Sequence, residues 1–186
     1  MEAAEGRLLV VTGPPGAGKS TVASLLADRR ASSVLVEGDA FFRFVRQGFV
    51  EPWLEESAQQ NTVTVAAAAK AAGRFAAGGY MTVYDGVVGP WFLDHFLDES
   101  GLNLLDYVVL MPPVELCLDR VRTRIGHGFT DEDATRKMHA DFENAGGASS
   151  HIIHEPLESA EAVAELIEKR LAANTLIYPR QQATSA

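Results

Sequence analysis

Short runs of apolar residues alternate along this chain with longer segments in which apolar residues recur at helical spacing. Such alternation is typical of βα units built around a parallel sheet. The first run, Leu8 to Val11, is continuously apolar, which suits a strand buried on both faces. The runs predict five strands, at residues 8–11, 34–36, 80–84, 107–111 and 152–153.

The segments between these runs predict helices. Thr130 is followed three residues later by Asp133, a spacing that resembles a capping box and predicts a helix start. The tail after Asn174 carries Leu176, Ile177 and Tyr178, and the polar part that follows is expected to fray. We see no repeat, linker or composition change, so residues 1–186 are predicted to form a single α/β domain. The expected helices lie at 18–29, 41–45, 57–77, from about 114, from 130 to about 147, and from about 159.

Composition narrows the classes of partner. The chain has 186 residues, of which 47% are hydrophobic and 22% charged, and its formal net charge is −9. An acidic balance disfavours non-specific binding to nucleic acid or to anionic membranes. One cysteine allows no intramolecular disulfide. No signal peptide or long apolar span is evident, so we expect a cytoplasmic protein, either monomer or homodimer, that acts on a small molecule.

The most specific motif follows the first predicted strand and precedes a predicted helix. It matches the phosphate-binding loop, or P-loop, at every fixed position. Its glycines let backbone N–H groups turn toward phosphate oxygens, and the helix start adds a positive dipole. The sequence therefore predicts ATP binding by this loop. The residues expected to bind the nucleotide are Gly13, Pro15, Gly16, Ala17, Gly18, Lys19, Ser20 and Thr21.

Two side chains of the loop have further predicted roles. Lys19 supplies a mobile positive charge for the β- and γ-phosphates, so it is a predicted catalytic residue. The Ser20 hydroxyl is placed to bind Mg²⁺. ATP and Mg²⁺ are therefore the expected cofactors.

Two carboxylates follow predicted strands, at the edge of the sheet where α/β proteins bind ligands. Asp39 is predicted to orient or deprotonate an acceptor hydroxyl, and Asp85 to join Ser20 in holding the metal. Asp85 and Gly86 are also placed at the acceptor site. In the alternative interpretation, each aspartate only caps the turn or helix that follows it.

Arg120 and Arg124 share a face of one predicted helix and precede a Gly-His-Gly break. They suit a short lid at about residues 126–147, with Arg120 on the nucleotide and Arg124 on the transferring phosphoryl group. The alternative is a solvated face on which the arginines pair with Glu115 or Asp119.

An aromatic segment follows Asp39. Phe42 and Trp53 are predicted to shape the acceptor site, although most of the five aromatic residues are expected to form a local core. Gln59, Gln60 and Asn61 offer hydrogen bonds to a hydroxylated substrate. The five residues are Phe41, Phe42, Phe44, Phe49 and Trp53.

With these motifs, nearly the whole chain resembles the small P-loop kinases of metabolites and antibiotics: gluconate kinase, shikimate kinase and chloramphenicol phosphotransferase. The resemblance rests on the P-loop, on residues 36–39, and on the lid stretches 124–129 and 138–143. It implies a three-layer fold with a five-stranded parallel sheet in the order 2-3-1-4-5 and a short helical lid. It also implies that Asp39 contacts the acceptor hydroxyl and that Arg120 and Arg124 embrace the nucleotide.

The resemblance has limits that bear on the substrate. Gluconate kinases carry a Ser-Ala-Leu-Lys run where this chain has residues 85–90, so gluconate itself is not expected. We predict transfer of the γ-phosphate of ATP to a hydroxyl of a sugar acid-like metabolite or an antibiotic. A motor of the AAA type needs a further helical domain, for which the chain leaves little space.

Two alternatives stay open. One is a non-catalytic ATP-binding protein. The other is a nucleoside monophosphate kinase, whose acceptor phosphate needs several basic residues. The segment after Asp39 offers Arg43, Arg46, Lys70 and Arg74 for that purpose.

Overall fold

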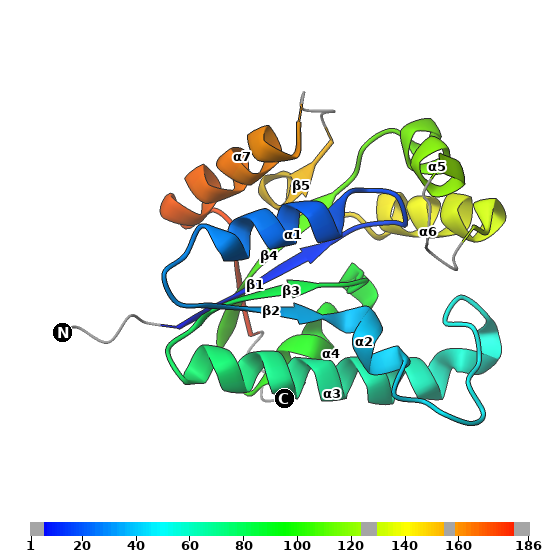
Figure 1. Cartoon of the computed structure of the whole chain (residues 1–186), viewed down its shortest axis with the longest axis horizontal. Helices are drawn as coiled ribbons and strands as arrows, with labels where there is room; N and C mark the ends of the chain where they lie inside the picture. Colours follow the sequence, from blue (N-terminus) through cyan, green and yellow to red (C-terminus); the bar gives the residue numbers. More distant parts are fainter. Residues whose placement is uncertain (1–5, 124–129, 155–158, 181–186) are drawn as a thin grey trace, which may run out of the picture.

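A computed structural model of the chain describes residues 6–123, 130–154 and 159–180. Helices and strands alternate through most of these residues (Figure 1). None of the described helices combines the length and apolar character that a membrane crossing requires. The elements are β1 (Arg7–Thr12), α1 (Lys19–Asp28), β2 (Ser33–Glu37), α2 (Gly38–Phe42), η1 (Glu55–Ser57), α3 (Ala58–Ala77), β3 (Met81–Asp85), α4 (Pro90–Ser100), β4 (Leu104–Leu110), α5 (Val114–Thr123), α6 (Glu132–Ala145), η2 (Ser149–His151), β5 (Ile152–Ile153), α7 (Ala160–Ala172) and β6 (Ile177–Pro179).

The sheet has the order that the sequence predicted. Its parallel strands run β2-β3-β1-β4-β5, and β3 lies between the P-loop strand β1 and β2. A sixth strand, β6, was not predicted. It pairs antiparallel with the start of β4, where Leu105 lies opposite Tyr178. The apolar part of the tail thus pairs with the sheet, since the edge of β4 offers unpaired backbone groups there. Most of the polar residues that were expected to fray lie outside the described residues.

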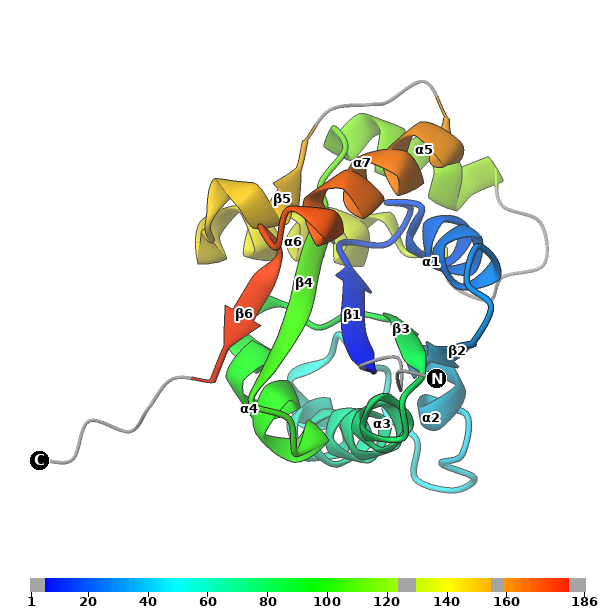
Figure 2. The same ribbon diagram turned by 90° about the vertical axis from the view of Figure 1, so that its left-hand side faces the viewer.

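Two hydrophobic cores cover the two faces of the sheet, which makes three layers (Figures 1 and 2). Side chains of a strand point alternately to opposite faces. Leu8 and Val10 of β1 therefore pack with residues of α3 and α4, whereas Leu9 and Val11 pack with residues of α1 and α7. This burial fixes the register of β1 and so the position of the loop that follows it.

One helix was not predicted, and the starts of α2 and α6 differ from their predicted positions. Helix α2 begins at Gly38 rather than at residue 41. Helix α4 buries Leu93, Phe96, Leu97 and Ser100, a helical spacing that follows Gly89 and the helix-starting Pro90, so its signals were present. Helix α6 begins one residue later than the predicted capping box implies. Its N-cap is Asp131, whose side chain accepts a hydrogen bond from the Ala134 N–H, and not Thr130.

Candidate active site

The carboxyl ends of the strands gather the predicted catalytic groups at one edge of the sheet. Asp85 is the last residue of β3, where it lies beside Val11 of β1 and Glu37 of β2. Asp39 lies in the first turn of α2, two residues beyond the end of β2. Neither aspartate caps a helix, because the N-caps of α2 and α4 are Glu37 and Gly89 and no side chain caps either helix. The capping interpretation is therefore wrong for both residues.

The P-loop adopts a conformation that requires glycine. Gly13 has φ 143°, and a Cβ built there would lie 2.2 Å from the carbonyl oxygen of Leu110. Gly16 has φ 78°, and a Cβ there would lie 2.3 Å from the carbonyl oxygen of Cys117. The loop ends at the N-terminus of α1, whose first N–H groups have no partner within the helix. This arrangement fits a phosphate chain, since backbone donors and a positive dipole meet at one place.

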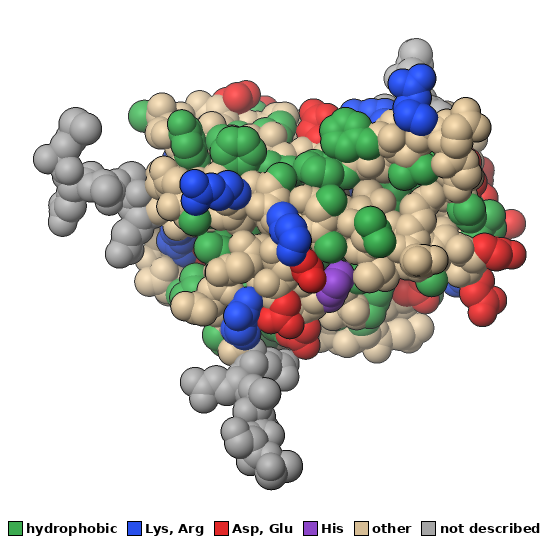
Figure 3. Space-filling model, turned by 90° about the horizontal axis from the view of Figure 1, so that it is seen from below, with side chains coloured by type: hydrophobic (Ala, Val, Ile, Leu, Met, Phe, Trp, Pro, Cys, Tyr) green, Lys and Arg blue, Asp and Glu red, His purple; other side chains and the backbone are tan. Residues whose placement is uncertain are grey.

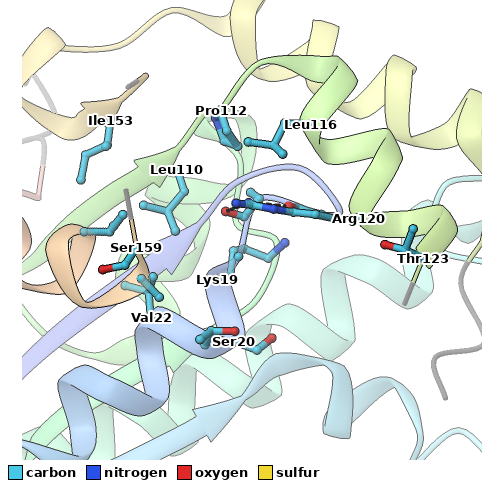
Figure 4. Close-up of a pocket in the computed structure, with 16 residues that line it drawn as sticks. Lys19, Ser20, Val22, Leu110, Pro112, Leu116, Arg120, Thr123, Ile153 and Ser159 are labelled. Atoms are coloured by element: carbon cyan, nitrogen blue, oxygen red, sulfur yellow. Dashed lines mark hydrogen bonds between the residues drawn. The ribbon is translucent and has the colours of Figure 1, made fainter. Parts of the chain in front are cut away.

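Arg120 holds the P-loop from outside. Its Nη1 donates hydrogen bonds to the carbonyl oxygens of Gly16 at 3.2 Å and Ala17 at 3.4 Å, while Lys19 Nζ donates to the carbonyl oxygen of Pro14 at 3.0 Å. Figure 4 shows Arg120 reaching from α5 across the loop. Arg120 is exposed, but its guanidinium is bound to the loop backbone, and within the described residues it forms no ion pair with Glu115 or Asp119.

A cavity of about 490 Å³ lies on this side of the loop (Figure 4). The P-loop residues 16–21 and Arg120 form one wall, and apolar residues from β4, α5, β5 and α7 form the rest. Leu110, Leu116 and Ile153 are among these apolar residues. We call it the nucleotide cavity, because an apolar wall beside a phosphate-binding loop suits a nucleoside base.

A second cavity of about 820 Å³ lies on the other side of the loop. Five of the residues that the sequence placed at the acceptor site line this space. We call it the acceptor cavity. Gly16, Lys19 and Ser20 line both cavities, so the P-loop separates them. The predicted acceptor residues are Asp39, Phe42, Trp53, Asp85 and Gly86.

Asp85 has a raised pKa in the acceptor cavity. Burial raises its pKa, and the charges of Asp39 and Glu37 raise it further. A hydrogen bond from the Ser20 hydroxyl and the charge of Lys19 act in the opposite direction. Ser20 and Asp85, the predicted metal ligands, therefore contact each other, which suits a divalent cation because its charge would relieve the crowded carboxylates.

The aromatic segment departs from its predicted packing. Phe42, Phe49 and Trp53 line the acceptor cavity, and Phe44 is 69% exposed. Phe41 packs against the core and against the ring of Phe44, with centroids 5.4 Å apart. The expectation that most of the five form a local core is therefore wrong, since the cavity takes three of them.

Polar side chains at the start of α3 hold the loop between α2 and α3 in place. Gln60 forms two hydrogen bonds with the backbone of Val50. Its Oε1 accepts from the Val50 N–H at 2.9 Å, and its Nε2 donates to the Val50 carbonyl oxygen at 2.7 Å. Asn61 Nδ2 donates to the carbonyl oxygen of Pro52 at 2.7 Å and to Ser57 Oγ at 2.9 Å. Of the three polar residues predicted to meet substrate, only Asn61 lines the acceptor cavity in the described part of the chain. Gln60 acts on the loop instead.

The predicted lid is described in part. Arg124 and residues 125–129 lie outside the described residues, so the predicted role of Arg124 stays a prediction. Arg122 of α5 donates two hydrogen bonds to the carboxylate of Glu132 in α6, from Nε at 2.6 Å and from Nη2 at 2.7 Å. The Nε2 atom of buried His139 in α6 lies 2.9 Å from the carbonyl oxygen of Pro112. The first half of α6 faces the acceptor cavity through residues 130, 131, 134 and 138.

The structure adds cavity residues that the sequence analysis missed. Trp91 and Phe92 come from the unpredicted helix α4. Tyr84 was assigned only to a strand, yet it is buried against Phe96 and lines the cavity beside Asp85. Glu51 and Asp131 also line the cavity. No local motif marks these residues, because they meet only when α3, α4 and α6 pack on the sheet.

The fold and the phosphate loop define a P-loop domain, which implies nucleotide binding. Residues 8–145 match the protein family described as an AAA domain, and since they form more than half of the chain, the protein belongs to this family. A comparison with curated proteins found no match. Within the described residues the chain forms one sheet with its helices, without a further helical domain of the kind that an AAA motor needs.

Three solved structures with a similar fold are compared with this chain. A tunicamycin resistance protein of Deinococcus radiodurans has a TM-score of 0.68 and 18% identity over 89% of this chain and 95% of its own. A gluconokinase of Sinorhizobium meliloti 1021 has a TM-score of 0.65 and 19% identity, over 94% of this chain and 95% of its own. A shikimate kinase of Acinetobacter baumannii, in complex with shikimate, has a TM-score of 0.62 and 19% identity, over 93% of this chain and 97% of its own. The resemblance to gluconate and shikimate kinases is thus confirmed for the fold, which is P-loop kinase-like.

Proposed function

We propose that the protein is an ATP-dependent phosphotransferase that transfers the γ-phosphoryl group to a hydroxyl of a small molecule, such as a metabolite or an antibiotic. One observation supports this above the others. The P-loop separates two cavities, and Gly16, Lys19 and Ser20 line both of them. A donor and an acceptor bound in these cavities would meet at Lys19, where phosphoryl transfer needs positive charge.

Each side of the site would contribute differently. The P-loop backbone and Lys19 would hold the phosphates, with Arg120 keeping the loop in shape. Ser20 and Asp85 would hold Mg²⁺, directly or through water. When bound, ATP supplies the phosphoryl group and Mg²⁺ neutralises part of its charge.

Asp39 would act on the acceptor. It lines only the acceptor cavity, and it lies close enough to Asp85 to raise the pKa of that carboxyl. A carboxylate in this position would orient the acceptor hydroxyl and accept its proton as the bond to phosphorus forms. Because the transition state of phosphoryl transfer is loose, orientation should contribute more than basicity.

The acceptor cavity also bears on the two alternatives. A protein that only binds ATP has no use for a second cavity of about 820 Å³ beside its phosphate loop. A nucleoside monophosphate kinase needs several cations for the acceptor phosphate. Of the four basic residues considered for that purpose, only Arg43 lines the cavity among the described residues. Both alternatives therefore have weaker support than a small-molecule kinase.

The test is a screen of hydroxylated metabolites and antibiotics in which ADP release is followed. Each hit is checked by mass spectrometry for the added phosphoryl group, and Lys19→Ala serves as the inactive control. We expect at least one acceptor to stimulate ADP release well above the rate without acceptor. Nucleotide binding without a phosphorylated product across the whole screen would favour the non-catalytic alternative.

A further inference from the structure

The acceptor cavity carries an excess of negative charge. Its described cationic side chains are Lys19 and Arg43, and Lys19 belongs to the phosphate loop. Arg43 lies 3.7 Å from Glu37, a carboxylate outside the lining. The lining carboxylates are Asp39, Glu51, Asp85 and Asp131.

If Lys19 and Asp85 are committed to phosphate and metal, Arg43 is the one cation left among the described lining residues, and it faces three carboxylates: Asp39, Glu51 and Asp131. Figure 3 shows acidic side chains gathered at the right-hand end of the molecule, where Figure 1 places the segment between α2 and α3. Asp39, Glu51 and Asp131 are exposed, so solvent screens their charges in part, but an anionic acceptor would still add like charge beside three carboxylates. A cationic group would be attracted for the same reason.

Aromatic side chains supply the other wall. They come from the α2–α3 segment and from α4, on both sides of the carboxylates. Aromatic faces bury apolar parts of a ligand and also attract cations through their ring quadrupole. The residues are Phe42, Phe49, Trp53, Trp91 and Phe92.

Asn61 adds an acceptor that lacks a donor. Its Nδ2 is bound to Pro52 and Ser57, but its Oδ1 is buried and has no hydrogen-bond partner among the described residues. A buried acceptor without a donor is costly, so a donor from a ligand or from water is expected there. Like the carboxylates, this oxygen accepts hydrogen bonds, so it favours a ligand that carries hydrogen-bond donors.

We infer that the acceptor is an amino alcohol: a molecule with the hydroxyl to be phosphorylated, a protonated amine and an apolar body. The inference rests on the proposed function and narrows it, because sugar acids and nucleoside monophosphates, which are anions, fall outside this class. Glu51 and Asp131 would bind the amine, and the aromatic wall would bind the apolar body.

Binding can be measured without turnover, because the two tryptophans of the chain, Trp53 and Trp91, both line this cavity. Three probes share a phenyl group and a similar size but differ in charge: phenylalaninol is a cation, 3-phenyl-1,2-propanediol is neutral and 3-phenyllactate is an anion. Tryptophan fluorescence is titrated with each probe. We expect phenylalaninol to bind about tenfold more tightly than the diol and the anion to bind least. Equal or tighter binding of 3-phenyllactate would overturn the inference.

A charge-removing variant locates the effect. Glu51→Gln should reduce the preference for phenylalaninol over the diol about fivefold, whereas Glu55→Gln, in the same segment but outside the lining, should leave it unchanged. Equal effects of both variants would show that the preference comes from the overall charge and would overturn the assignment to this cavity.

The same probes, together with gluconate, are then tested for ADP release, which separates the two proposals. Phosphorylation of the cationic alcohol in preference to the others supports both. Preferred phosphorylation of gluconate or 3-phenyllactate leaves the proposed function intact and overturns the amino alcohol. Selective binding of the cation, with no product from any acceptor in the wider screen, supports the ligand class and contradicts the kinase.

Discussion

The two cavities beside the P-loop are built in different ways. The wall that would hold phosphates comes from one continuous segment, residues 13–21, whose shape is fixed by its own glycines and by the start of α1. The acceptor cavity draws on the P-loop, β3, α2, α3, α4, α5, α6 and the loops after α2 and β3. A local motif can be recognised in a sequence because its residues lie at fixed spacing, whereas a cavity built from many segments exists only in the folded chain.

The two sides of the P-loop also differ in charge. Lys19 lines both cavities, Arg120 adds a second cation on the nucleotide side, and four carboxylates line the acceptor side. The nucleotide side therefore suits polyanionic phosphates, and the acceptor side suits a ligand with donors and positive charge. Substitutions that change one side while sparing the other test whether the two are functionally separate.

The largest effect is expected on the shared wall. Lys19→Ala removes the charge that would follow the γ-phosphoryl group, so turnover should fall roughly 10³-fold. The measurement is the rate of ADP release with a saturating acceptor, together with circular dichroism to confirm folding. Lys169→Ala, which removes an exposed lysine of α7, is the matched control. Turnover close to wild type in folded Lys19→Ala would refute the catalytic role of the loop.

Asp39→Asn should affect the acceptor side alone. It keeps the size of the side chain but removes the charge that would take the hydroxyl proton, so turnover should fall roughly 10²-fold. The dissociation constant for ATP should change by less than about twofold, because Asp39 does not line the nucleotide cavity. Asp28→Asn, at the exposed end of α1, controls for loss of one carboxylate. Weakened ATP binding in Asp39→Asn would show that the two sides are not separate.

Asp85→Asn should separate stability from activity. Because burial raises the pKa of Asp85, the native state binds the proton more tightly than the unfolded chain does. The free energy of unfolding therefore falls as pH rises from the ordinary aspartate pKa through the raised native value, and the full cost is present above that value.

Removing this charge should make the Asp85→Asn variant more stable than wild type at pH 7, with a flatter pH dependence, while turnover falls about tenfold or more through loss of a metal ligand. Urea unfolding at pH 4 and pH 7, and turnover at saturating Mg²⁺, measure the two effects. Asp133→Asn, an exposed carboxylate of α6, is the control. A less stable Asp85→Asn protein at pH 7 would contradict the assigned cause of the shift.

The smallest effect is expected from the residue that holds the aromatic loop. Gln60→Ala removes two hydrogen bonds to the Val50 backbone, so Phe49 and Trp53 should be less well positioned. Two such bonds are worth about 1–3 kcal/mol, and we expect KM for the acceptor to rise about three- to tenfold with ATP affinity unchanged. Gln59→Ala, at the exposed neighbouring position, should change neither. Identical KM values for the two variants would show that the loop does not depend on Gln60.

The sequence alone determined the parallel sheet, its strand order through the family resemblance, and the P-loop. The sheet could be predicted because a strand buried on both faces must be continuously apolar. The P-loop could be predicted because phosphate binding needs glycine and lysine at fixed spacing. The assignment of Asp39 and Asp85 to one site also succeeded, since parallel strands bring their carboxyl ends to one edge of the sheet.

The tertiary structure alone decided what surrounds those carboxylates. Trp91, Tyr84 and Asp131 come from elements that are far apart in sequence and meet only through packing on the sheet. The same packing turned Gln60 toward the loop backbone, placed Phe49 on the cavity wall beside the predicted Phe42 and Trp53, and tied Arg120 to the P-loop. Spacing along a chain reports contacts within one element, whereas charge and shape in a cavity depend on the sum of several elements, which no single segment encodes.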